Sequence, residues 1–194
     1  MFKTIYKSIF QSRGFTLVET LVAISILSIS IAAVFSAVQN GIRSSTIAKD
    51  QVTAFYLVQE AMEFIRNIRD ENALYTISGD PKNWLAGLSS NSNDPCWYGD
   101  SLVPQKTCKI DSYMKDVTTC SNGICPPIKQ DSVTGLYGYT NGPDTSFIRK
   151  IQFQKISDIP NKQYDQVLVI ISISWVARGI TKSFQIKELL FDHQ

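Results

Sequence analysis

Apolar residues are concentrated at the start of the chain, in a run far longer than any later one. Between Phe15 and Val38 the only charged residue is Glu19. A helix of this length rises roughly 36 Å at about 1.5 Å per residue, whereas the hydrocarbon core of a bilayer is about 30 Å thick. The pattern therefore predicts that residues 15–38 form a membrane-spanning helix.

Within that helix, small and polar residues recur every fourth position, at Ser28, Ala32, Ser36 and Asn40. Such a stripe lets helices approach closely in lipid. The alternative is that these residues only dilute an apolar helix.

Residues 39–73 have the pattern of an amphipathic helix and are predicted to continue the first one. Apolar positions fall on one face, at Leu57, Ala61, Phe64, Ile65 and Ile68. Polar positions fall on the other, at Glu60, Glu63, Arg66, Asn67 and Asp70. One side should pack against a folded domain. On the polar side, Arg66 is predicted to pair with Glu63 and Asp70.

The last stretch, residues 148–194, is predicted to form strands over 148–156, 167–177 and 182–191. The second alternates strictly, with Val167, Val169, Ile171, Ile173 and Trp175 on one side. Arg178 and Gly179 supply a tight turn before the third strand. We therefore expect an α+β fold, in which a small antiparallel C-terminal sheet packs on the amphipathic half of the long helix.

Basic residues are confined to one side of the apolar run. Lys3, Lys7 and Arg13 precede it without any acidic residue, and no comparable cluster follows it closely. The positive-inside bias then keeps the N-terminus in the cytoplasm and places the rest of the chain outside.

Residues 74–147 are rich in Gly, Pro, Ser, Asn and Asp and are predicted to be mostly loop and turn. They contain all four cysteines, Cys96, Cys108, Cys120 and Cys125. An even number outside the cytoplasm indicates two disulfides, with three possible connectivities. The Asn-Gly turn between Cys120 and Cys125 favours that pair, which leaves Cys96 with Cys108. Zinc is the alternative, but only the 120–125 spacing approaches that of a structural site, so no metal or other cofactor is predicted.

The junction Arg13-Gly14-Phe15-Thr16-Leu17-Val18-Glu19, followed by the apolar run, resembles the processing site of type IV prepilins. Residues 1–14 would then be the leader. The resemblance to the type IV pilin and pseudopilin family implies that a membrane-embedded prepilin peptidase cuts between Gly14 and Phe15 and methylates the new terminus. An ordinary secretory signal and a plain membrane anchor are the alternatives, but the run is long for the first and Glu19 is unexplained by the second.

Glu19 needs a partner because a buried charge is tolerated chiefly when it is paired. After cleavage, the ammonium group of Phe15 would lie one helical turn before it. The family resemblance implies that Glu19 pairs with the terminus of a neighbouring subunit and so sets the register of the growing filament.

The layout looks most like the PilV-like minor pilins, since the long helix leads into a variable middle and a closing C-terminal hairpin. The 69 residues after Cys125 contain no cysteine, unlike those of most abundant pilins. The predicted function is a minor subunit of a pilus or pseudopilus, first held in the inner membrane by lipid and then built in by the assembly platform with other subunits. The alternative is an adhesin or DNA-uptake module carried by the filament, or a plain anchored extracytoplasmic domain.

Enzyme function is not predicted, because the single histidine, His193, is next to last in the chain and allows no catalytic triad. Nucleic-acid binding is also unsupported. Without the three basic residues of the leader, 16 basic and 17 acidic residues remain. A local basic patch of Arg149, Lys150 and Lys155 around Phe153 is more typical of a soluble strand face.

Overall fold

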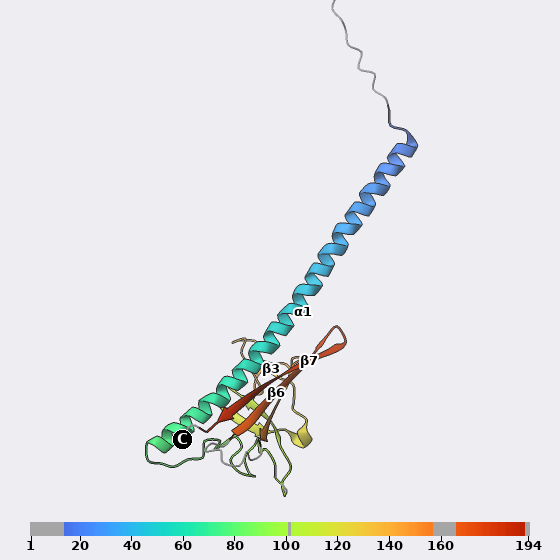
Figure 1. Cartoon of the computed structure of the whole chain (residues 1–194). Helices are drawn as coiled ribbons and strands as arrows, with labels where there is room; N and C mark the ends of the chain where they lie inside the picture. Colours follow the sequence, from blue (N-terminus) through green and yellow to red (C-terminus); the bar gives the residue numbers. More distant parts are fainter. Residues whose placement is uncertain (1–13, 101, 157–165, 193–194) are drawn as a thin grey trace, which may run out of the picture. The chain divides into compact units, whose positions relative to one another are not determined.

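The computed structural model describes residues 14–100, 102–156 and 166–192. The predictions for the leader and for His193 lie outside these residues, apart from Gly14. The chain divides into two compact units, Met1–Ile47 and Ala48–Gln194, which are described separately. Figure 1 colours the elements by their place in the chain, from blue near the N-terminus to red near the C-terminus.

A single helix, α1, runs from Leu17 to Ile77 and confirms the predicted long N-terminal helix. It begins two residues after the predicted start and ends four residues after the predicted end. Gly41 does not interrupt it. In the first unit its side chains are almost all exposed, whereas in the second unit it buries one face, including Leu57, Ala61 and Ile65.

A five-stranded antiparallel sheet has the order β2-β1-β5-β6-β7. The three predicted strands are its β5 (Ile148–Lys155), β6 (Gln166–Ala177) and β7 (Ile180–Phe191). Residues 178 and 179 form the predicted two-residue turn, with φ of 56° at Arg178 and 76° at Gly179. Positive φ at both central residues matches the right-handed twist of a hairpin.

The other two strands of the sheet come from the region predicted to be mostly loop. They are β1 (Thr107–Asp111) and β2 (Asp116–Thr119), and Cys108 of β1 pairs with Ile151 of β5. The same region also contains a short 3-10 helix, Ser121–Gly123, and a small second sheet of β3 (Lys129–Gln130) and β4 (Tyr137–Gly138). These elements are too short to give a periodic apolar pattern.

The core lies between the amphipathic part of α1 and one face of the large sheet. The alternating residues of β6 all point into it, since Val167, Val169, Ile171, Ile173 and Trp175 are buried. The loop between α1 and β1 closes the core with Trp84, Leu85 and Leu88. This confirms the predicted packing of sheet on helix.

Arg66 joins the helix to the sheet by an ion pair that the sequence did not indicate. Its guanidinium donates two hydrogen bonds to the Glu188 carboxylate of β7, at 2.8 and 2.5 Å, and also pairs with Glu63. These contacts, chiefly the hydrogen bond to Glu188, raise the pKa of Arg66. The predicted pair with Asp70 is wrong, because Asp70 instead accepts from the adjacent Arg69.

Arg149 is buried and does not belong to an exposed basic patch. Its guanidinium donates to the carbonyl oxygens of Leu57 in α1 and Ile110 in β1, the latter at 2.6 Å, and lies 4.0 Å from Glu60. Phe153 is also fully buried, so Lys150 and Lys155 have no exposed aromatic ring between them. The arginine ties three elements together through backbone acceptors.

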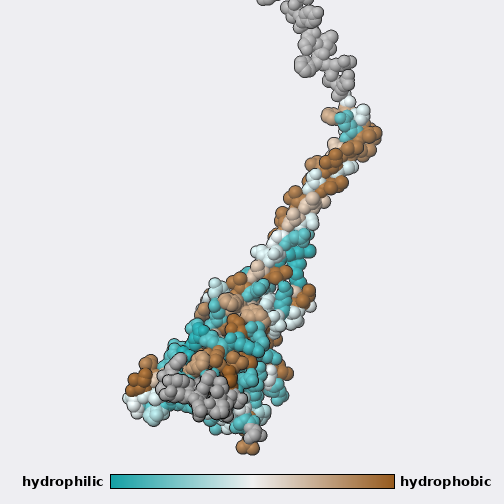
Figure 2. All heavy atoms as spheres, viewed as in Figure 1, coloured by the Kyte–Doolittle hydropathy of each residue, from teal (hydrophilic) through white to brown (hydrophobic). Residues whose placement is uncertain are grey.

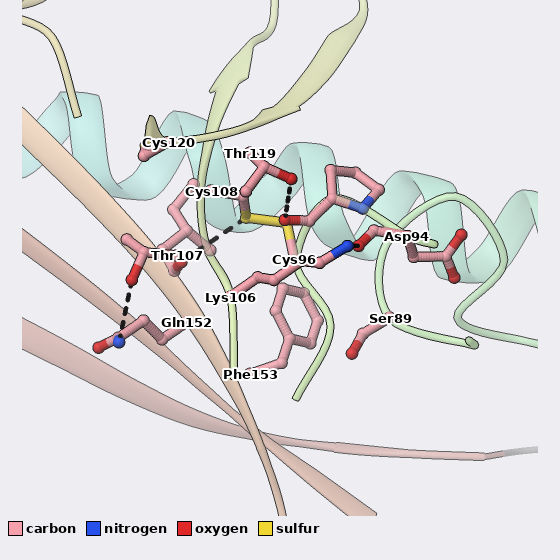
Figure 3. Close-up of a disulfide and its surroundings, with 12 residues drawn as sticks. Ser89, Asp94, Cys96, Lys106, Thr107, Cys108, Thr119, Cys120, Gln152 and Phe153 are labelled. Atoms are coloured by element: carbon pink, nitrogen blue, oxygen red, sulfur yellow. Dashed lines mark hydrogen bonds between the residues drawn. A yellow bond between two sulfur atoms is a disulfide. The ribbon is translucent and has the colours of Figure 1, made fainter. Parts of the chain in front are cut away.

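All four cysteines form disulfides, Cys96 with Cys108 and Cys120 with Cys125, as the Asn-Gly turn favoured. The first bond fixes the loop before β1 onto the sheet (Figure 3). Close by, Lys106 donates to the carbonyl oxygens of Ser92 and Asp94, and Thr119 donates to that of Pro95. Because all four cysteine sulfurs are in disulfides, they do not offer the thiolate ligands that the zinc alternative needs.

Tyr139 is a buried phenol, and burial is the main cause that raises its pKa. The nearby Arg149 guanidinium lowers the pKa of Tyr139 and offsets part of this rise. A raised pKa adds stability that is present below the unfolded-state value of about 10 and is lost as the pH rises through the folded value. We expect Tyr139→Phe to remove this loss. Above pH 10, the free energy of unfolding of the variant should therefore rise relative to that of wild type by up to about 1.4 kcal/mol per pH unit.

The measurement is urea unfolding of both proteins at pH 8 and at several values above 10. Tyr113→Phe is the matched control, since Tyr113 is 62% exposed. An equal response to alkali in wild type and Tyr139→Phe would contradict the prediction.

Candidate processing and assembly site

The Gly14-Phe15 peptide bond lies in an exposed segment immediately before α1. Phe15 is 78% exposed, and a Cβ built on Gly14 would have no neighbour within 4 Å. Space within the described chain therefore does not require glycine here. A requirement for glycine would come from the enzyme that binds this segment.

Thr16 caps the N-terminus of α1, a role that the sequence analysis missed. Its hydroxyl accepts a hydrogen bond from the backbone N–H of Glu19 at 3.3 Å, and its carbonyl accepts from the N–H of Thr20 at 3.1 Å. The signal was present, because Thr-x-x-Glu before an apolar run is the sequence of a capping box. The cap fixes the start of the helix two residues after the candidate cleavage site.

Glu19 lies in the first turn of α1, where the partial positive charge of the helix terminus favours a carboxylate. No described residue donates a hydrogen bond to its carboxylate or pairs with it. Phe15 precedes the helix in this uncleaved chain, and its nitrogen is still part of a peptide bond. The pairing of Glu19 with a free terminus therefore stays a prediction.

The first unit presents the surface expected of a helix in lipid. Leu17, Leu21 and Phe35 are each more than half exposed, and apolar atoms cover much of this helix in Figure 2. By length and composition, α1 is able to cross a membrane. Four of its hydroxyl groups are bonded within the helix. Those of Thr20, Ser25, Ser28 and Ser30 donate to carbonyls three or four residues earlier, at 2.8–2.9 Å. No free donor from these four residues would face hydrocarbon.

A family model described as the prokaryotic N-terminal methylation motif matches residues 9–35. This range contains the Gly14-Phe15 junction, the Thr16 cap, Glu19 and more than half of the apolar run. The N-terminus is a type IV pilin-like prepilin signal. The searches of curated proteins and of solved structures returned no match.

The prepilin signal implies processing by prepilin peptidase and assembly with other pilins. Together with α1, it also supports anchoring in a membrane. Gly14, Phe15 and Glu19 all fall within the matched range, whereas the four cysteines lie beyond it in the second unit.

Proposed function

We propose that this chain is a minor type IV pilin-like subunit. Prepilin peptidase cuts it between Gly14 and Phe15 and methylates the new terminus. Residues 15–38 hold it in the inner membrane, with the N-terminus in the cytoplasm and the second unit outside. The assembly platform then builds it into a pilus or pseudopilus with other subunits, and its role is structural rather than enzymatic.

One observation carries this proposal: the matched prepilin signal leads without a break into a helix that is uncovered in the first unit and buried on one face in the second. A plain anchor needs the uncovered part only. Neither an exposed Gly14-Phe15 bond nor a carboxylate in the first turn of the span serves anchoring.

Two features support a minor subunit of the PilV-like kind. Both disulfides lie between Cys96 and Cys125, so the C-terminal hairpin of β6 and β7 carries none. Abundant subunits usually have a disulfide loop near the C-terminus. The disulfides also support the proposed orientation, because such bonds persist in oxidising compartments outside the cytoplasm.

The test is N-terminal and intact-mass analysis of the full chain expressed with a prepilin peptidase, beside a Gly14→Val variant. We expect the wild-type chain to begin at a methylated Phe15. The variant should stay uncut, because its larger side chain obstructs the peptide in the peptidase cleft. An open environment around Gly14 means that valine clashes with nothing in the described chain, so the variant should fold normally.

Circular dichroism of the variant is the control for folding. A chain that is cut near Ala37, or that stays uncut with Gly14 intact, would contradict the proposal. In either case the second unit would belong to an ordinary secreted or anchored protein.

A further inference from the structure

Three loops of the second unit lie at one end of its large sheet. Strands β1 and β6 each pair antiparallel with β5, so they run in the same direction and end together. The β1–β2 turn, residues 112–115, and the β6–β7 turn, residues 178–179, therefore project from the same end. The β6–β7 hairpin reaches beyond its neighbour, because β5 pairs with β6 only as far as Ser174 (Figure 1).

The third loop, residues 131–136 between β3 and β4, is held at this end by Asp111. The buried carboxylate of Asp111 accepts hydrogen bonds from the backbone N–H of Met114, at 3.1 Å, and from that of Tyr139, at 2.8 Å. Tyr113 and Leu136 line one small cavity, so the first and third loops lie side by side. The name loop end is used below for residues 112–115, 131–136 and 176–182 together.

The loop end exposes large apolar side chains to solvent. Val133 is 93% exposed and Ile180 65%, and Tyr113, Met114 and Val176 are each more than half exposed. All three loops contribute to this set. Exposed apolar side chains that gather in this way mark an interaction surface, whereas singly scattered ones need no explanation.

Basic side chains accompany the apolar ones. From Gln166 to Lys187 the chain carries Arg178, Lys182 and Lys187 and no acidic residue. Lys115 is exposed in the β1–β2 turn. Among the described residues, no ion pair involves Arg178 or Lys182. Apolar side chains beside such cations suit an anionic lipid surface, because the former enter the interface and the latter attract the head groups.

Acidic residues at or beside the loop end offset this charge only in part. The Asp131 carboxylate is turned onto its own loop, where it accepts from the backbone N–H groups of Val133 and Thr134 at 2.7 and 3.0 Å. Asp116 is exposed, but it follows Lys115 directly and offsets that single lysine. The β6–β7 hairpin therefore carries the excess positive charge.

The loop end is also the end at which α1 enters the second unit. Near the start of the unit, Val52 of α1 lines a groove with Phe184 of β7. Further along both elements, Arg66 donates to Glu188. The helix and β7 therefore run in the same direction, away from the β6–β7 turn. Residues 39–47, which link this end to the apolar run, reach at most roughly 30 Å at about 3.3 Å per residue, however the two units are arranged.

Building on the proposed function, in which a membrane anchors the chain before assembly, we propose that the loop end binds the surface of that membrane through its anionic lipids. Val133 and Ile180 enter the head-group region, and Arg178 and Lys182 pair with lipid phosphates. The contact orients the second unit on the bilayer while the subunit awaits assembly.

The test places the full chain in lipid vesicles, with an Ile180→Cys substitution that carries a fluorescent label. All native cysteines are in disulfides, so the label reacts only with the added thiol. The vesicles contain phosphatidylcholine alone or mixed with phosphatidylglycerol, and some lipids carry a nitroxide quencher at the head group. We expect quenching at position 180 to be at least about twofold stronger on the anionic mixture, because each basic side chain near the surface adds attraction.

Ile77→Cys is the matched control for the label. It replaces the same residue type at a position that is 81% exposed, but it lies at the far end of α1. Its label should be quenched weakly and to the same extent on both kinds of vesicle.

A second arm removes one charge from the chain labelled at position 180. Lys182→Gln should weaken quenching on the anionic vesicles about twofold, since the loop end then loses one of its cations. Lys155→Gln is the control, because it removes an exposed lysine from the end of β5 that is distant from the loop end. It should leave the quenching unchanged.

A Ser36→Cys label, within the apolar run, separates the possible failures. If lipid quenches position 36 but not position 180, or quenches positions 180 and 77 equally, the loop-end proposal is overturned and the proposed function stands. Equal quenching of position 180 on the two kinds of vesicle, or equal effects of the two lysine variants, would overturn it as well. If position 36 is not quenched either, the chain is not anchored in lipid and both proposals fall together.

Discussion

Glu19→Gln is expected to leave the chain processed and inserted in the membrane but to reduce its incorporation into filaments at least tenfold. The carboxylate lies at the start of an apolar helix, and no described residue pairs with it. In a filament, the proposed partner is the terminal ammonium group of a neighbouring subunit. Removing one member of a buried charge pair costs about 2 to 5 kcal/mol, and 1.4 kcal/mol is already tenfold.

The Glu19→Gln variant removes the charge without removing the helix cap. The Thr16 hydroxyl accepts from the backbone N–H of residue 19, which the variant keeps, so the start of α1 should be unchanged. Glu71→Gln is the matched control, since it removes the same charge from an exposed position of the same helix. The measurement is the amount of processed chain in the sheared filament fraction relative to the membrane fraction. Equal incorporation of Glu19→Gln and wild type would rule out an assembly role for the charge.

The parts of the fold that the sequence predicted are those with long periodic patterns. The helix was evident from its uninterrupted apolar run and the amphipathic pattern that follows, and β6 from its strict alternation. The hairpin turn was evident because Arg178-Gly179 stands between two strand patterns. Local chemistry alone also favoured the Cys120–Cys125 disulfide, through the Asn-Gly turn.

The features that the sequence did not reveal depend on residues far apart in the chain. Strand β1 has only five residues and is defined by its pairing with β2 and β5. Arg149 looked like a surface cation because nothing nearby in sequence showed that the carbonyls of Leu57 and Ile110 would meet it in the core.

The candidate site divides in the same way. Gly14, Phe15 and Glu19 could be proposed from their spacing, and their roles stay predictions. Thr16 could also have been found from the sequence, because its capping box is local. An apolar groove between α1 and β7 could not be found from the sequence, since Val52 and Phe184 are brought together only when β7 packs beside the helix. Before that, Phe55 and Tyr56 look like further residues of an amphipathic face.

The two disulfides are expected to contribute unequally to the second unit, and the larger loss follows removal of Cys96–Cys108. This bond closes a loop with a sequence separation of 12, against 5 for Cys120–Cys125. Loop-closure entropy then gives about 3 kcal/mol for the first and about 2 kcal/mol for the second. Cys96 and Cys108 are also fully buried beside Ile110 and Ile151, so shortening them leaves a cavity that adds to the loss.

The double variants Cys96→Ala/Cys108→Ala and Cys120→Ala/Cys125→Ala compare the bonds without leaving a free thiol. Thermal unfolding of each full chain in mild detergent, followed by near-ultraviolet circular dichroism, measures the second unit. We expect the first variant to unfold at least about 10 °C below wild type, and the second to lose roughly half as much. An equal or reversed loss would show that the loop is held chiefly by Trp84, Leu88 and the Lys106 hydrogen bonds, with the disulfide secondary.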